Sequence, residues 1–137
     1  TEIRVIVGQT NQGTVGAVVN NYTYPTYLDV SLPAHTDFEQ SLAKAHNAFI
    51  YMIEGYITVL NAEDNPIDTQ TNYLRAKKLA VLTKGEQLQV RSSADGARFL
   101  LIAGQPLEEP VARGGPFVMN TKAEVRQAFT DFRQGNF

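Results

Sequence analysis

The chain has 137 residues, of which 43% are hydrophobic, none is cysteine, and its formal net charge is -2 at pH 7. This composition predicts one folded domain over residues 1–137 and excludes a disordered chain, a disulfide framework and a thiolate site. The slightly acidic balance argues against direct nucleic-acid binding, and no apolar run reaches the roughly 20 residues of a membrane span. We therefore expect a cytoplasmic protein with no nucleic-acid or membrane partner. The start at Thr1, without a methionine, suggests a processed product or a fragment.

The first half of the chain shows the alternation of apolar and polar residues that is typical of half-buried strands. Ile3, Val5 and Val7 share one face of a strand predicted over 2–7. The same pattern predicts a strand over 26–32, and a shorter polar one follows over 37–42. The glycine- and asparagine-rich residues 9–16 are predicted to form a loop.

The second half predicts further strands separated by turns. Residues 48–53 are apolar on both faces, as in the central strand of a closed sheet. A turn is predicted at Glu54-Gly55, and a long polar loop over 61–72. Other turns are expected at Lys84-Gly85 and Ala94-Asp95-Gly96, and the remaining strands at 56–60, 79–82, 87–91 and 98–103.

The end of the chain predicts its one helix. Thr121 is placed to cap it, and Glu124, three residues on, completes a capping box. Gly135 supplies the stop. An apolar stripe with helical spacing runs through Val125, Ala128, Phe129 and Phe132. About eight short strands and this late helix together predict an all-β fold, an antiparallel barrel or jelly roll with a C-terminal α-helix.

The side chains that could carry chemistry are few. His35 and His46 are the only histidines, and with Asp37, Glu39 or Glu54 they are the candidates for a metal site, which needs three or four convergent ligands. Their spacing is neither helical nor H-x-H, so we expect His35 in a loop and His46 at the entry to the central strand.

Hydrolytic chemistry is not indicated. The chain has no Gly-x-Ser-x-Gly elbow, and its adjacent acids, Glu63-Asp64 and Glu108-Glu109, stand in polar or proline-bounded stretches that would not raise a carboxyl pKa. No catalytic residue is predicted.

Aromatic residues gather in two places, around Pro25 and in the C-terminal segment. A helix with an apolar stripe must dock on a surface, so the C-terminal segment is the predicted interface. Its candidate residues are Phe117, Val118, Val125, Phe129 and Phe132.

The segment 104–121, GQPLEEPVARGGPFVMNT, resembles the C-terminal signature of the pirins, members of the cupin superfamily. Residues 124–137 are similar to the pirin terminal helix and tail. Upstream, 27–30 and 46–55 look like the pirin C-terminal cupin domain, so the resemblance covers nearly the whole chain. It implies a cupin-type barrel.

Pirins have two cupin domains, and the similarity falls on the second. The resemblance implies that iron, or another divalent metal, is held in the first domain by three histidines and a glutamate. In a metal-binding cupin, an H-x-H pair and a glutamate would stand where this chain has Ser41, Ala43 and Ala48. We therefore expect this chain to hold no cofactor.

Three functions remain open. The chain could be a metal-free structural and protein-interaction module of a pirin-type redox- or transcription-linked regulator. It could be the non-catalytic half of a quercetin 2,3-dioxygenase-like metalloenzyme whose metal site lies in a missing N-terminal domain. It could also be a barrel that binds a small molecule. Its expected partners are an N-terminal cupin domain, another protein, or a second copy that docks on the C-terminal segment.

Overall fold

A computed structural model describes residues 1–60 and 73–136. The chain forms two compact units, Thr1–Pro106 and Leu107–Phe137. The predicted loop over 61–72, with Glu63-Asp64, falls outside the described residues. The single-domain organisation over 1–137 stays a prediction.

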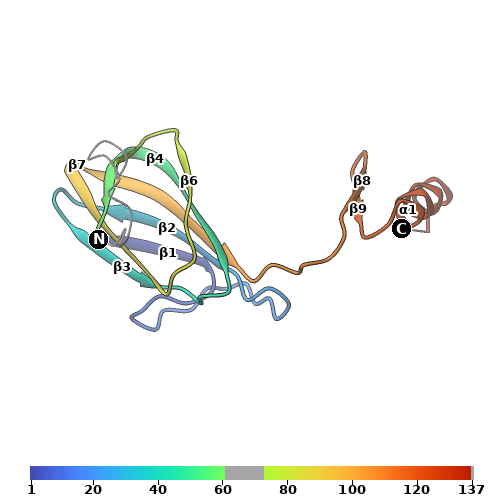
Figure 1. Cartoon of the computed structure of the whole chain (residues 1–137), viewed down its shortest axis with the longest axis horizontal. Coiled ribbons are helices and arrows are strands. Elements are labelled where there is room, and N and C mark those ends of the chain that lie inside the picture. Colours follow the sequence, from blue (N-terminus) through green and yellow to red (C-terminus); the bar gives the residue numbers. More distant parts are fainter. Residues whose placement is uncertain (61–72, 137) are drawn as a thin grey trace. The chain divides into compact units, whose positions relative to one another are not determined.

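The first unit is an antiparallel β-structure whose strands curl around a common interior (Figure 1). Its strands follow the alternating segments of the sequence, because side chains two residues apart face the same side of a sheet. They are β1 (Glu2–Val7), β2 (Thr26–Leu32), β3 (Asp37–Ser41), β4 (Asn47–Val59), β5 (Tyr73–Arg75), β6 (Leu79–Val81) and β7 (Gln87–Gly104).

The strand β7 organises this unit. Its first part pairs with β3, its last part pairs with β2, and β4 pairs with both parts from the other side. β1 extends the sheet beyond β2, while β5 and β6 both pair with β4. Every one of these pairings is antiparallel, and most join segments far apart in the sequence.

The predicted turns at Glu54-Gly55 and at 94–96 are wrong. Residues 47–59 and 87–104 each form one continuous strand, and the register between the two strands shifts around Glu54 and Gly55. Gly55 and Gly96 have φ of 68° and 79°, a left-handed conformation that favours glycine. The strands therefore bend at these glycines without reversing.

The core of the first unit is built from the inward face of each strand. Phe99 on β7 is fully buried and meets Phe38 of β3 edge to face, with ring centroids 5.7 Å apart. The edge-to-face geometry is favourable for aromatic pairs. The buried cluster around them contains Leu28, Val30, Leu32, Ile50, Met52, Ile57, Leu88, Val90, Ala97 and Leu101.

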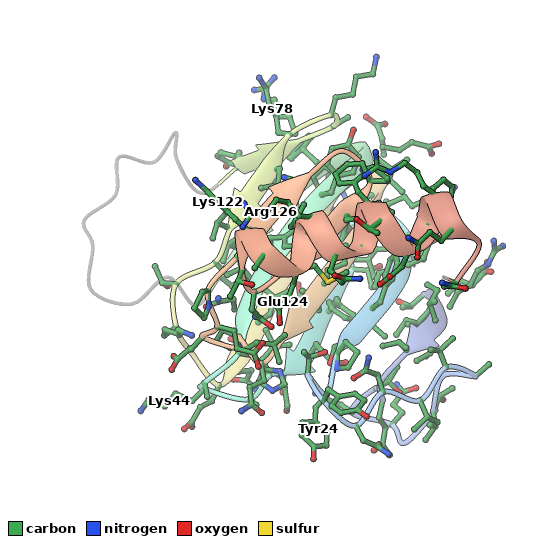
Figure 2. The ribbon with its side chains drawn as sticks, turned by 90° about the vertical axis from the view of Figure 1, so that its right-hand side faces the viewer. Tyr24, Lys44, Lys78, Lys122, Glu124 and Arg126 are labelled. Carbon is green, nitrogen blue, oxygen red and sulfur yellow. The ribbon has the colours of Figure 1, made fainter. Side chains whose placement is uncertain are left out.

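The second unit is a hairpin with a helix. β8 (Ala112–Gly114) and β9 (Phe117–Met119) pair across a turn at Gly115 and Pro116, and α1 (Lys122–Gln134) follows. The predicted caps are confirmed: the Thr121 hydroxyl accepts from the Glu124 amide, and Gly135 is left-handed. Figure 2 shows Glu124 in the first turn of α1. None of the helices in the described ranges is long and apolar enough to span a bilayer.

The helix packs on the hairpin through a small apolar core. Phe117 meets Phe129 with ring centroids 4.9 Å apart and Phe132 at 6.0 Å. A Cβ on Gly114 would lie 2.6 Å from Cγ1 of Val125, so glycine is needed for this close approach. Val125 and Ala128 are the helix residues buried there.

Candidate functional site

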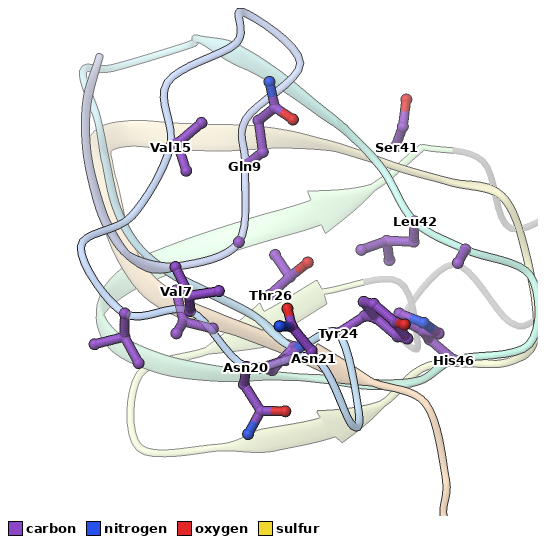
Figure 3. A pocket seen from close by; sticks show the side chains of 15 residues that line it. Val7, Gln9, Val15, Asn20, Asn21, Tyr24, Thr26, Ser41, Leu42 and His46 are labelled. Atoms are coloured by element: carbon purple, nitrogen blue, oxygen red, sulfur yellow. The ribbon is translucent and has the colours of Figure 1, made fainter.

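The candidate site is a pocket of about 590 Å³ in the first unit (Figure 3). It lies at the end of the sheet where β2 begins and β3 ends, and the long loop between β1 and β2 forms much of its wall. This volume is within the roughly 300–1,000 Å³ of small-molecule sites.

The pocket has an apolar and a polar side. Val7, Val15, Val18 and Val19 form the apolar side, and three of these valines are well exposed. The polar side carries Tyr24, Thr26, Ser41 and His46, with Leu42 among them, as Figure 3 shows. Gln9, Asn20 and Asn21 lie between the two sides.

The polar side is assembled from separate elements. Thr26 is the first residue of β2, Ser41 is the last of β3, and His46 immediately precedes β4. Thr26 pairs with Ala103 and Asn47 with Gly104, so β7 brings the two ends together. In the described part of the chain, no hydrogen bond is seen for the side chains of Tyr24, Thr26, Ser41 and His46.

The structure does not bring the two histidines together. His46 lines the pocket beside the start of β2, whereas His35 lies in the turn after the last residue of that strand. The His35 amide donates to the carbonyl of Ser93, near the middle of β7. The two histidines thus stand at opposite ends of β2, in the turn and at the strand entry that the sequence predicted.

Two of the three carboxylates considered with the histidines have other partners, and the third is exposed. Asp37 accepts two hydrogen bonds from Arg91, the shorter at 2.5 Å, and this pairing lowers the pKa of Asp37 below its ordinary value. Glu39 accepts from Gln89 at 3.1 Å, and Glu54 is an exposed residue of β4. Across residues 1–60 and 73–136, no three histidine or acidic side chains are grouped as a metal site would require. Whether the protein is metal-free stays a prediction.

A half-buried ion pair lies on the sheet, outside the pocket lining. Asp29 on β2 accepts two hydrogen bonds from Arg98 on β7, at 3.0 and 2.8 Å. These bonds outweigh the desolvation of the carboxylate and lower the pKa of Asp29. The pair joins two strands and has no role in the pocket.

The positions of the metal ligands in the cupin pattern can now be located. Ser41 and Ala43 line the pocket, while Ala48 is buried in β4. The resemblance to metal-binding cupins implies that a hydroxyl and two methyl groups stand where such a cupin has two imidazoles and a carboxylate.

The predicted interface residues divide into two kinds. Phe117 and Val125 are buried between the hairpin and α1, each only 8% exposed. Val118, Phe129 and Phe132 remain accessible, with Phe132 65% exposed. Their role as an interface stays a prediction.

The sequence left a small-molecule-binding barrel open as a function but did not predict which residues line this pocket. Residues 9–16 were expected only as a loop, and the aromatic cluster near Pro25 was not connected with His46. The sequence signal for the pocket was the group of valines at Val15, Val18 and Val19 in a predicted loop. Apolar side chains that cluster in an exposed loop often mark a binding site.

Comparison with known proteins identifies the family. Residues 27–137 match the family model described as the pirin C-terminal cupin domain. The chain is 39% identical over 137 residues to a Pseudomonas aeruginosa protein named as a candidate quercetin 2,3-dioxygenase, covering 98% of this chain and 45% of the relative. It is 40% identical over 108 residues to human pirin, covering 78% of this chain and 35% of the relative.

A solved structure agrees with the fold. The crystal structure of a quercetin 2,3-dioxygenase from Acinetobacter baumannii aligns with a TM-score of 0.81 and 31% identity, over 98% of this chain and 43% of that one. The chain thus spans less than half the length of these relatives, and the fold is a cupin-type antiparallel β-structure with a C-terminal helix. The chain belongs to the pirin C-terminal cupin domain family.

Proposed function

We propose that this chain is the non-catalytic cupin domain of a cytoplasmic pirin-type protein, in which it acts as a structural and protein-interaction module without a metal of its own. The observation that carries the proposal is the chemistry at the three ligand positions of the cupin pattern. Ser41, Ala43 and Ala48 offer no imidazole or carboxylate, and the two histidines lie at opposite ends of β2. Metal-dependent chemistry would then belong to another part of a longer protein.

The interaction role is supported by the second unit. It contains about thirty residues, and units below roughly 40 residues rarely bury enough surface to be stable alone. Its exposed apolar side chains are Val118, Phe129 and Phe132, with Leu107 and Val111 before the hairpin. A surface of this kind is typical of a docking site. In a longer protein the first cupin domain would cover it, and in this chain alone a second copy would.

The first test is elemental analysis of the purified chain together with a flavonol oxidation assay. We expect well below one metal ion per chain and no turnover. A stoichiometric metal would contradict the metal-free assignment, and flavonol turnover by this chain would contradict its non-catalytic role.

The second test is the oligomeric state, measured by analytical ultracentrifugation. We expect the chain to dimerise and Phe132→Asp to shift it to monomer, because a carboxylate would be buried without a partner in the interface. Tyr22→Asp is the matched control, since Tyr22 is 84% exposed and lies in the first unit. If Phe132→Asp and the parent chain have the same oligomeric state, the interface assignment is wrong.

A second function is favoured by the names of the relatives. Two of the matched proteins, from Pseudomonas aeruginosa and Acinetobacter baumannii, carry the name of quercetin 2,3-dioxygenase, the first as a candidate. A longer protein that contains this chain could therefore cleave flavonols with a metal in its other domain. Flavonol turnover by the longer protein, but not by this chain, would support that function.

A further inference from the structure

The pocket of the first unit has a property that the proposed function does not use. Its lining residues include none with a permanently charged side chain: no aspartate, glutamate, lysine or arginine. Burying a charge without a partner is strongly unfavourable, and the buried group shifts its pKa toward the neutral form. The lining therefore favours an uncharged occupant.

The two sides of the pocket further define this occupant. Val7 is buried at the floor, and Val15, Val18 and Val19 continue the apolar side toward the rim, where they are 64%, 54% and 75% exposed. Such side chains gain free energy when an apolar group covers them. An apolar body would lie against this side.

The opposite side offers hydrogen bonds. Thr26 and His46 are half-buried, Ser41 and Tyr24 stand at the rim, and the described residues supply none of these four side chains with a hydrogen-bond partner. Together they present three hydroxyls and an imidazole, which can donate to or accept from a hydroxyl or carbonyl oxygen. A polar head would lie here.

We propose that this pocket binds an uncharged amphipathic small molecule, with an aliphatic or alicyclic body against the valines and a hydroxyl or carbonyl head beside Thr26 and His46. The pocket volume of about 590 Å³ is sufficient for a ligand of this type. The proposal is independent of the proposed function, because a domain that binds such a molecule can be catalytic or not.

The test uses Nile red, an uncharged dye whose emission rises in apolar surroundings, and competition by 1-octanol, 1-decanol and decanoate. We expect saturable Nile red binding and displacement of the dye by both alcohols. The affinity of the alcohol should rise several-fold with each added methylene, so decanol should displace the dye at lower concentration than octanol. Decanoate has the same chain length but a carboxylate head, and we expect it to compete at least tenfold less well.

Variants locate the site. Thr26→Val keeps the shape of the side chain and removes the hydroxyl, so decanol binding should weaken about two- to tenfold. Thr58→Val is the matched control, because Thr58 is a half-buried strand residue on β4 outside the pocket lining. In amide spectra, decanol should perturb Thr26, Leu42 and His46.

Three results would overturn the proposal. The first is the absence of saturable binding of both Nile red and decanol to the folded chain. The second is displacement of Nile red by decanoate as strong as by decanol. The third is a decanol perturbation confined to the amides of α1. Metal content and oligomeric state, which test the proposed function, are not affected by any of these results.

Discussion

The two units differ in the range of the contacts that hold them together. In residues 1–106, the core residue Phe99 meets Phe38 from a strand some sixty positions away, and β7 pairs with β2, β3 and β4. In residues 107–137, Phe117 meets Phe129, and the hairpin and α1 follow one another directly. We therefore expect the first unit to unfold cooperatively and the second unit to open by local steps.

The strongest test of this contrast is the same substitution in both units. Phe99→Ala should lower the free energy of unfolding by about 3–5 kcal/mol, since it leaves a cavity at a fully buried position. Phe117→Ala should mainly remove the amide protection of α1, as measured by hydrogen exchange. If Phe117→Ala reduced the amide protection of β2 and β7 as much as Phe99→Ala does, the two units would unfold together and the contrast would be wrong.

The bends of the long strands provide a second test. Gly55 has φ of 68°, and a Cβ there would lie 2.3 Å from the carbonyl oxygen of Gly96. Gly55→Ala should therefore lower the free energy of unfolding by about 2–4 kcal/mol, measured by urea denaturation. Gly85→Ala is the control, because a Cβ at Gly85 meets nothing within 4 Å. A small effect at Gly55 would mean that the bend can relax.

The smallest effects are expected for the ion pairs, of which the pair between β2 and β7 should contribute more. Asp29→Asn should lower the free energy of unfolding at pH 7 by on the order of 1 kcal/mol after solvent screening. Asp37→Asn should have less effect, because both side chains of its pair with Arg91 are more than half exposed.

The pH dependence of this effect has a definite sign. Arg98 lowers the pKa of Asp29 in the folded chain, so the stabilisation is present above the ordinary value of 3.8 and is lost as pH falls through the lower folded value. The difference between the parent chain and Asp29→Asn in thermal denaturation should therefore shrink below about pH 4. A difference that persists at lower pH would assign the effect to shape and not to charge.

Much of the local structure could be predicted from the sequence. The alternation over 2–7 and 26–32 predicted β1 and β2, and the capping box at Thr121 and Glu124 predicted the start of α1. Gly135 likewise predicted the C-terminal end of α1. These features depend on residues within one strand or one helical turn, so the sequence contains all the information that they need.

The turns at Gly55 and Gly96 show where this reasoning ends. Glycine with positive φ is compatible with a reversal and with a bend, and the local sequence does not distinguish them. Strand pairing decides between a reversal and a bend. β4 and β7 remain paired on both sides of the bend, from Asn47 with Gly104 to Val59 with Val90. A reversal at either glycine would have broken that long ladder.

By itself, the sequence determined the strand-rich class, the C-terminal helix with its caps and the resemblance to the pirins. The tertiary structure alone decided that Tyr24, Thr26, Ser41 and His46 share a pocket with the valines of the first long loop. These residues come from separate segments, and the pairing of β2, β3 and β4 with β7 positions the strands whose ends carry the polar ones. Convergence of this kind depends on strand register, which is fixed by long-range packing and is not encoded in any one segment.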